Sequence, residues 1–190
     1  MKIGLFGGSF DPVHLGHLLV AQAAREELGL TRLFFIPAAQ SPFKPDSKPT
    51  ADGVRLQLLR LALAGKTWCE IDDQELRRGG VSYTIDTVRD YARRFDGAEI
   101  FYLIGTDHVA KLPQWREAGE LARLAEFVVI PRPGEAEVPF PKPFRGRVLQ
   151  GFPFEVSSSQ IRARVRAGLP VDPLLPAAVA EAVRNNQLYL

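Results

Sequence analysis

The chain has 190 residues, 46% of them hydrophobic, which predicts one domain with a sizeable core. Lys and Arg total 24 against 22 for Asp and Glu, and a formal charge of +2 argues against a nucleic-acid partner. One cysteine excludes an internal disulfide and a thiolate metal cluster, and no apolar run reaches the roughly 18 to 20 residues of a membrane span, so we expect a cytoplasmic protein with no membrane partner.

The first half of the chain alternates apolar strands with amphipathic helices. The strands are expected at 2–6, 32–37 and, as a third strand region, 67–72 with part of 74–78. The helices are expected at 18–28, 51–64 and 82–95. Gly29 and Gly65 follow the first two helices, and Gly79-Gly80 breaks the chain before the third.

The second half continues this alternation and then becomes helical. The strands are expected at 99–104, 126–130 and 147–150, and the helices at 114–124, 157–167 and 176–186. Residues 132–146 contain four prolines, so they are expected to form an exposed connection to which no chemistry is assigned.

Several of these strands are apolar throughout, which is typical of parallel strands buried on both faces. The pattern therefore predicts an α/β fold: a Rossmann-like, mostly parallel sheet with helices on both faces and a C-terminal helical part, in one domain over 1–190. Ligands of such sheets bind beyond the carboxyl ends of the strands. The candidate site residues all fall there.

The segment 7–17, GGSFDPVHLGH, joins the first strand to a helix. Gly7 and Gly8 let the main chain approach an anion, and His14 and His17 project from the first helical turn, where free N–H groups and the helix dipole attract phosphate. A lone histidine is more often a capping or core residue, but the three features together favour a phosphate site. Neither the G-x-x-x-x-G-K-[ST] nor the G-x-G-x-x-G pattern is present.

At these residues the chain resembles the H-x-G-H nucleotidyltransferase superfamily, and GGSFDPVHLGH is similar to its nicotinate mononucleotide adenylyltransferase branch. The resemblance implies transfer of the adenylyl group of ATP to nicotinate mononucleotide, giving nicotinate adenine dinucleotide and pyrophosphate in NAD biosynthesis. Within this segment it assigns ATP binding to Gly7, Gly8, Ser9, Phe10, His14 and His17. The catalytic residues it implies are His14, His17, Lys44 and Arg162.

Residues 156–162, VSSSQIR, form a second candidate cluster. The serines predict a helix start, and Arg162 and Arg166, four residues apart, share one helix face. Taken alone, the segment is explained as well by a serine cap followed by a solvated basic face. It resembles the superfamily motif I-S-S-T-x-I-R, which implies that Ser158, Ser159 and Arg162 hold the β- and γ-phosphates of ATP.

The segment 82–87, SYTIDT, opens a helix whose free N–H groups suit a carboxylate, although capping by Ser82 or Thr84 explains it about equally well. It is similar to the S-Y-T-x-D-T of the same branch. The resemblance therefore implies that Tyr83 and Thr84 bind the nicotinate carboxylate.

Three more residues are assigned to the mononucleotide by the resemblance: Asp107 to its ribose hydroxyls, Trp115 to stacking on the pyridine ring, and Lys44 to the phosphates. From the residues alone, Asp107 as an N-cap, Trp115 as a core residue and Lys44 as an exposed loop lysine remain open.

The implied reaction needs no general base, because a substrate phosphate is already ionised at neutral pH. Its barrier is electrostatic, so the site needs positioned donors and cations. Mg²⁺ is expected as cofactor, held mainly by phosphates and water, since the sequence offers no obvious carboxylate cage.

Four other functions compete with adenylyl transfer to nicotinate mononucleotide. Phosphopantetheine adenylyltransferases resemble the chain but are usually shorter and carry threonine in place of His14. Nicotinamide mononucleotide is a closer rival substrate, and a nucleotide sensor without turnover is disfavoured because neither the histidines nor Arg162 are lost. The KMSKS loop of aminoacyl-tRNA synthetases is absent. The sequence leaves open whether the chain forms a homo-oligomer.

Overall fold

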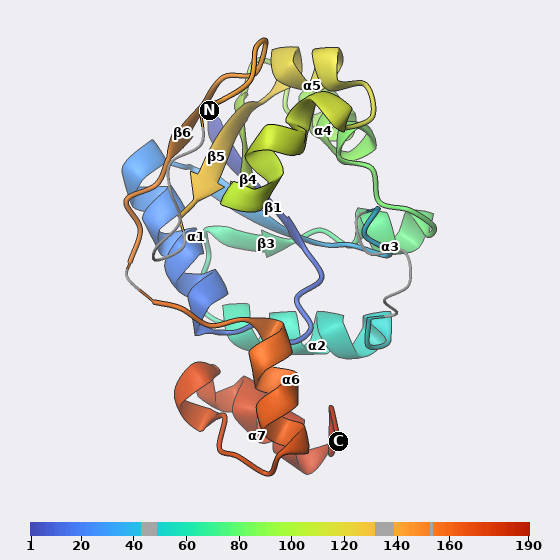
Figure 1. Ribbon diagram of the computed structural model, residues 1–190, viewed down its shortest axis with the longest axis vertical. Coiled ribbons are helices and arrows are strands. Elements are labelled where there is room, and N and C mark those ends of the chain that lie inside the picture. The colour runs from blue at the N-terminus through green and yellow to red at the C-terminus, as the bar shows by residue number, and fades with distance from the viewer. Residues whose placement is uncertain (43–48, 132–138, 153) are drawn as a thin grey trace.

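The fold is built on a single six-stranded sheet with the order β3-β2-β1-β4-β5-β6, in which every neighbouring pair is parallel (Figure 1). The computed structural model describes residues 1–42, 49–131, 139–152 and 154–190. The strands are β1 (Lys2–Gly8), β2 (Arg32–Pro37), β3 (Cys69–Ile71), β4 (Glu99–Gly105), β5 (Glu126–Ile130) and β6 (Gly146–Val148). The predicted parallel sheet is thereby confirmed.

Helices cover both faces of the sheet, as predicted. The α-helices are α1 (Leu15–Leu28), α2 (Asp52–Leu63), α3 (Gln74–Arg78), α4 (Thr84–Arg94), α5 (Ala118–Leu124), α6 (Ser158–Arg166) and α7 (Ala177–Asn185); the 3₁₀ helices are η1 (Thr106–Gln114) and η2 (Asp172–Leu174). Figure 1 shows α1 and α2 on one side of the sheet and α4 and α5 on the other, with α6 and α7 beyond α2. None of these helices is long and apolar enough to cross a bilayer.

Side chains of β1, β2, β4 and β5 alternate between two hydrophobic clusters. In β2, Leu33 and Phe35 enter the cluster under α1 and α2, whereas Phe34 and Ile36 enter the cluster under α4 and α5. Because both faces are buried, the strand reads as apolar throughout. Ile161 of α6 belongs to the first cluster, which also joins the C-terminal helical part to the sheet domain.

Several predicted elements differ from the structure in type or in their boundaries. Residues 74–78 form helix α3 instead of strand, because Oδ1 of Asp72 accepts a hydrogen bond from the Gln74 N–H at 3.1 Å and turns the chain. The helix predicted at 114–124 begins only at Ala118, after η1 and an extended Trp115. The first helix begins earlier than predicted, at Leu15, and β6 is shifted towards the N-terminus.

Strands β1 and β4 lie side by side at the centre of the sheet. The chain leaves β1 towards β2 on one side and leaves β4 towards β5 on the other. At such a reversal the loops after the two strands diverge and leave a crevice at their carboxyl ends. The segment 7–17 begins there.

Candidate active site

A cleft of about 530 Å³ opens at the carboxyl ends of β1 and β4. The predicted residues that line it come from two distant parts of the chain: Ser9, His14 and His17 from the first loop and α1, and Ser158, Ser159 and Arg162 from α6. Hydrogen bonds join the two parts. Ser158 Oγ donates to the Pro12 carbonyl at 2.9 Å, and Arg162 Nη1 donates to the Asp11 carbonyl at 2.7 Å.

The serines of α6 have separate partners. Ser157 is the N-cap: its Oγ accepts from the Gln160 N–H at 3.2 Å, and its own N–H donates to Gln160 Oε1 at 2.8 Å. Ser159 Oγ accepts from Arg162 Nη2 at 3.3 Å. The serine cap proposed as the simple alternative therefore exists, at Ser157, while Ser158 and Ser159 face the loop and the arginine.

His14 and His17 form one unit at the start of α1. His14 is the N-cap residue, and the two rings are stacked with their centroids 3.7 Å apart. The His14 N–H donates to Nδ1 of His17 at 3.2 Å, so the proton of a neutral His17 ring must lie on Nε2. The ring of Phe10 packs at 5.0 Å from that of His17.

Burial keeps both rings neutral. It lowers the pKa of His14 from 6.5 to about 4. The pKa of His17 is lowered well below 6.5, first by burial and then by repulsion from His14. Near pH 7 the free protein therefore offers the His17 Nε2–H as a neutral donor, and among the described residues of the cleft lining the positive side-chain charge comes from Arg162.

Close packing explains two glycines. A Cβ on Gly7 would lie 2.6 Å from Tyr102 Oη, and one on Gly16 would lie 3.0 Å from both His14 Nδ1 and Val156 Cγ1. Gly16 thus lets the segment before α6 approach the histidines. Gly8 lies beside the ring of Phe10. Because Phe10 is only 1% exposed, it can offer a ligand its main chain but not its side chain.

Arg55 of α2 received no role from the sequence, yet its side chain is fully buried and holds three carbonyl groups. Its guanidinium donates to Ser9 O at 2.8 Å, to Ala38 O at 2.9 Å and to Thr50 O at 2.9 Å. It thereby fixes the loops after β1 and β2 against each other. The signal was present: Arg55 occupies the apolar face that Leu58, Leu59 and Ala62 continue.

Asp11, inside the 7–17 segment, was also given no role. Its Oδ2 accepts from the Thr50 N–H at 3.0 Å and its Oδ1 from the Tyr189 hydroxyl at 2.9 Å, so both carboxylate oxygens have partners within the protein. Lys44 precedes Thr50 in the chain and lies outside the described residues.

Of the residues assigned to the mononucleotide, Tyr83, Thr84, Asp107 and Trp115 lie outside the cleft lining, and Thr84 and Trp115 contact Tyr102 of β4. Thr84 Oγ1 donates to Tyr102 Oη at 3.4 Å, and the Trp115 ring meets Tyr102 edge-on with centroids 6.3 Å apart. The guanidinium of Arg116 lies 4.7 Å from the centroid of the Tyr83 ring. Tyr102, whose hydroxyl also covers Gly7, connects this group to the first loop.

The structure bears differently on the simpler explanations for these residues, which were helix capping for Ser82, Thr84 and Asp107 and core packing for Trp115. Tyr83 is the N-cap residue of α4 without a side-chain capping bond, so capping by Ser82 or Thr84 does not occur. Gly105, and not Asp107, is the N-cap of η1. Trp115 packs partly against the core, with its ring 5.9 Å from that of Phe127, so core packing accounts for part of its environment.

No three His, Cys, Asp or Glu side chains gather as a metal site within residues 1–42, 49–131, 139–152 and 154–190. Asp11 and Glu155 supply carboxylates to the cleft lining. A divalent cation here would have to take phosphate and water oxygens among its ligands.

The cytidylyltransferase-like family profile matches residues 5–164. The chain is 41% identical to a probable nicotinate-nucleotide adenylyltransferase of Opitutus terrae, over 100% of this chain and 98% of that protein. It is 38% identical to the nicotinate-nucleotide adenylyltransferase of Bacillus subtilis, over 99% and 98%. A structure of Plasmodium falciparum nicotinic acid mononucleotide adenylyltransferase complexed with NaAD has a TM-score of 0.81 at 18% identity, covering 99% of this chain and 97% of that one.

Proposed function

The chain belongs to the cytidylyltransferase-like family, and we propose that it transfers the adenylyl group of ATP to nicotinate mononucleotide, releasing nicotinate adenine dinucleotide and pyrophosphate in NAD biosynthesis. The observation that carries the proposal is the single cleft in which the stacked histidines of α1 face Ser158, Ser159 and Arg162 of α6. Residues 1–190 act as one nucleotidyltransferase domain.

The reaction is a direct in-line attack of the mononucleotide phosphate on the α-phosphorus of ATP. The P–O bond to the new phosphate oxygen forms while the bond to pyrophosphate breaks, and no covalent enzyme intermediate is involved. His17 donates its Nε2–H to an α-phosphoryl oxygen, where negative charge grows. His14, stacked on it, holds the ring in place and provides a second donor.

Pyrophosphate is held by the second half of the cleft. The free N–H groups at the start of α6 and the hydroxyls of Ser158 and Ser159 bind the β- and γ-phosphates, and Arg162 supplies positive charge. Gly7, Gly8, Ser9 and Phe10 bring main-chain groups to the phosphates. Lys44 is proposed to reach them from a segment outside the described residues.

Mg²⁺ accompanies ATP and neutralises charge on the triphosphate. The residues fit such an arrangement: the described lining contains the carboxylates of Asp11 and Glu155, and both oxygens of Asp11 already accept hydrogen bonds within the protein, so phosphate and water oxygens would be the main ligands of the ion.

The mononucleotide binds at the start of α4. The N–H groups at Tyr83 and Thr84, uncapped by any side chain, receive the nicotinate carboxylate, while Trp115 stacks on the pyridine ring and Asp107 binds the ribose hydroxyls. ATP and nicotinate mononucleotide are the proposed partners, with no nucleic acid or membrane, and the proposed location is the cytoplasm.

Pyrophosphate release by the purified full chain tests this function, with ATP, Mg²⁺ and nicotinate mononucleotide, nicotinamide mononucleotide or phosphopantetheine in separate arms. The carboxamide of nicotinamide mononucleotide would turn an NH₂ group towards the N–H donors at the start of α4 and leave one of these donors without an acceptor. The kcat/KM for nicotinate mononucleotide should therefore exceed that for nicotinamide mononucleotide by on the order of 10²-fold. Trp115→Ala should weaken binding of both pyridine mononucleotides and keep the preference for nicotinate over nicotinamide mononucleotide. Turnover with phosphopantetheine alone would overturn the assignment.

A further inference from the structure

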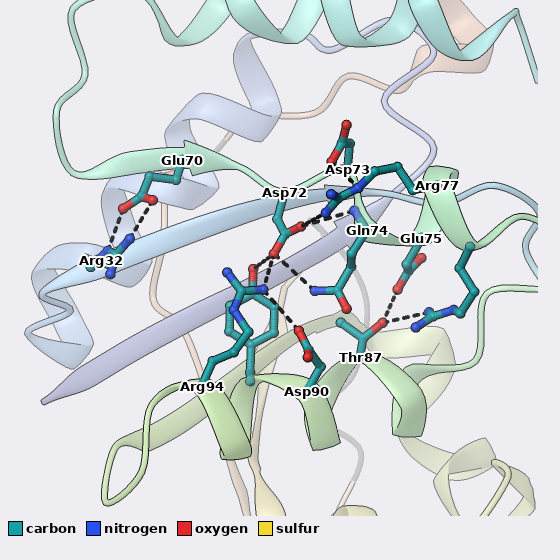
Figure 2. A network of polar contacts seen from close by, with 12 residues as sticks. Arg32, Glu70, Asp72, Asp73, Gln74, Glu75, Arg77, Thr87, Asp90 and Arg94 are labelled. Carbon is teal, nitrogen blue, oxygen red and sulfur yellow. Dashed lines mark hydrogen bonds and ion pairs between the residues drawn. The ribbon is translucent and has the colours of Figure 1, made fainter.

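Two buried carboxyl groups, three residues apart, hold opposite ends of α4 (Figure 2). Asp72, 8% exposed, accepts from the Tyr91 hydroxyl at 2.7 Å and from Arg94 Nη1 at 2.7 Å, both in the last turns of the helix. Glu75, 4% exposed, accepts from Thr87 Oγ1 at 2.6 Å, near its beginning. The two residues thus offer a natural comparison between the ends of one helix.

The contacts of Glu75 enclose the first turn of α4 from both sides. Thr87, fully buried, lies one turn into the helix and also accepts from Arg78 Nη2 at 3.2 Å. Ser82, which precedes the helix, is hydrogen-bonded through its hydroxyl to the same carboxyl group. The N-cap residue between them makes no side-chain capping bond, so Glu75 supplies a carboxyl group that contacts both sides of this turn.

The same network reaches the loop that lines the cleft. Ser82 Oγ accepts from the Ala39 N–H at 3.0 Å, and the Ser82 N–H donates to the Gln40 carbonyl at 2.9 Å. Ala39 lines the cleft. Glu75 therefore joins the start of α4 to the loop after β2 without lining the cleft itself.

We propose that Glu75 is a positioning residue for the mononucleotide: its carboxyl group fixes Ser82 and Thr87 so that the N–H groups at Tyr83 and Thr84 are aimed at the nicotinate carboxylate. The inference rests on the proposed function, since it concerns the same substrate. It adds that Glu75, which contacts neither ATP nor the mononucleotide, determines how well the mononucleotide is recognised. Misplacing recognition groups by as little as 1 Å weakens a site strongly, so the loss of Glu75 should appear in mononucleotide binding.

The test compares four variants of the full chain. Glu75→Leu removes the acceptors, Glu75→Gln keeps one, and Thr87→Val removes the donor without changing the shape of the side chain. Asp72→Asn is the matched control, since it alters an equally buried carboxyl group at the other end of α4. KM for each substrate is measured at saturating levels of the other.

Glu75→Leu and Thr87→Val should raise KM for nicotinate mononucleotide on the order of 10-fold while KM for ATP changes less than about twofold. Glu75→Gln should restore most of the mononucleotide affinity. Asp72→Asn should lower thermal stability and leave the ratio of the two KM values as in the wild type.

The positioning role is refuted if folded Glu75→Leu has the wild-type ratio of KM for nicotinate mononucleotide to KM for ATP. It is also refuted if Asp72→Asn changes this ratio as much as Glu75→Leu does. Should Glu75→Leu fail to fold, Thr87→Val decides by the same criterion. A wild-type chain without turnover on nicotinate mononucleotide contradicts the proposed function itself, an outcome distinct from turnover with an unchanged KM ratio.

Discussion

The hydroxyl group of Tyr189 donates to Oδ1 of Asp11 at 2.9 Å and so connects residues 178 positions apart. Burial and the neighbouring negative charge of Asp11 raise the pKa of Tyr189, which keeps the hydroxyl protonated as a donor. Asp11 also holds Thr50, so the histidine loop, the segment before α2 and the end of the chain meet at one carboxylate.

Tyr189→Phe removes this hydrogen bond while keeping the ring. A hydrogen bond to a carboxylate is worth about 1.5 to 3 kcal/mol, so Tm should fall by roughly 3–12 °C in a chain of this size. Differential scanning calorimetry measures it. An unchanged Tm would mean that water replaces the tyrosine hydroxyl without cost.

His17→Ala removes the donor that we place at the α-phosphate. Because this donor acts on charge that develops in the transition state, kcat should fall by roughly 10² to 10³ with little change in either KM. Steady-state kinetics on protein with a wild-type circular dichroism spectrum measures the effect. A kcat near the wild-type value would remove His17 from the mechanism.

Arg162→Ala and Arg166→Ala form a matched pair on α6. Arg162 lines the cleft and donates to Asp11 O at 2.7 Å, whereas Arg166 lies one turn further along, in the last turn of the helix. Loss of a charged contact to phosphate costs about 1.5 to 3 kcal/mol, so Arg162→Ala should raise KM for ATP by on the order of 10- to 100-fold. Arg166→Ala should not. A defect in mononucleotide binding alone would contradict the assignment of Arg162 to the distal phosphates.

Stability should depend on pH through the buried histidines. The pKa of His14 is about 4 in the folded protein against 6.5 when unfolded, so the unfolded chain binds the proton more tightly. The contribution of His14 to the free energy of unfolding is complete above pH 6.5 and falls by about 3 kcal/mol as the pH is lowered towards 4. His17, whose pKa is also lowered, adds a loss of the same sign.

Urea unfolding from pH 7 to 4 measures this dependence, with His14→Gln as the comparison. Burial raises the pKa of Glu75, which gives the opposite slope in the acid part of the range, so the difference between the two proteins isolates the histidine. His14→Gln should lose less stability than the wild type on acidification. Parallel curves would show that folding does not lower the pKa of His14.

The sheet could be predicted because its strands are unambiguous. Residues such as Leu33 and Phe34 point to opposite faces, and both faces are buried, so the apolar run could be read without knowing its neighbours. Residues 74–78 were wrongly assigned to a strand region because the turn that starts α3 depends on the Asp72 side chain. Local contacts of this kind override an assignment read from a short segment.

Part of the candidate site could likewise be predicted from local sequence, and part could not. The motifs at 7–17 and 156–162 each carry local features, and the structure brings residues of both into one cleft. Arg55 and Glu75 act through partners distant in the sequence, such as Ser9 and Thr87, which no local pattern reveals. A charge on an apolar helix face was the available sign for Arg55; for Glu75 the sequence offered none.

The central place of β1 has a consequence for synthesis on the ribosome. This strand emerges first, but its neighbour β4 is complete only at Gly105, and the far wall of the cleft, α6, follows at 158–166. At ordinary rates of translation this delay is on the order of ten seconds. For that time the nascent chain carries an apolar strand that has β2 on one side and lacks β4 on the other, and the cleft can close only once α6 has emerged.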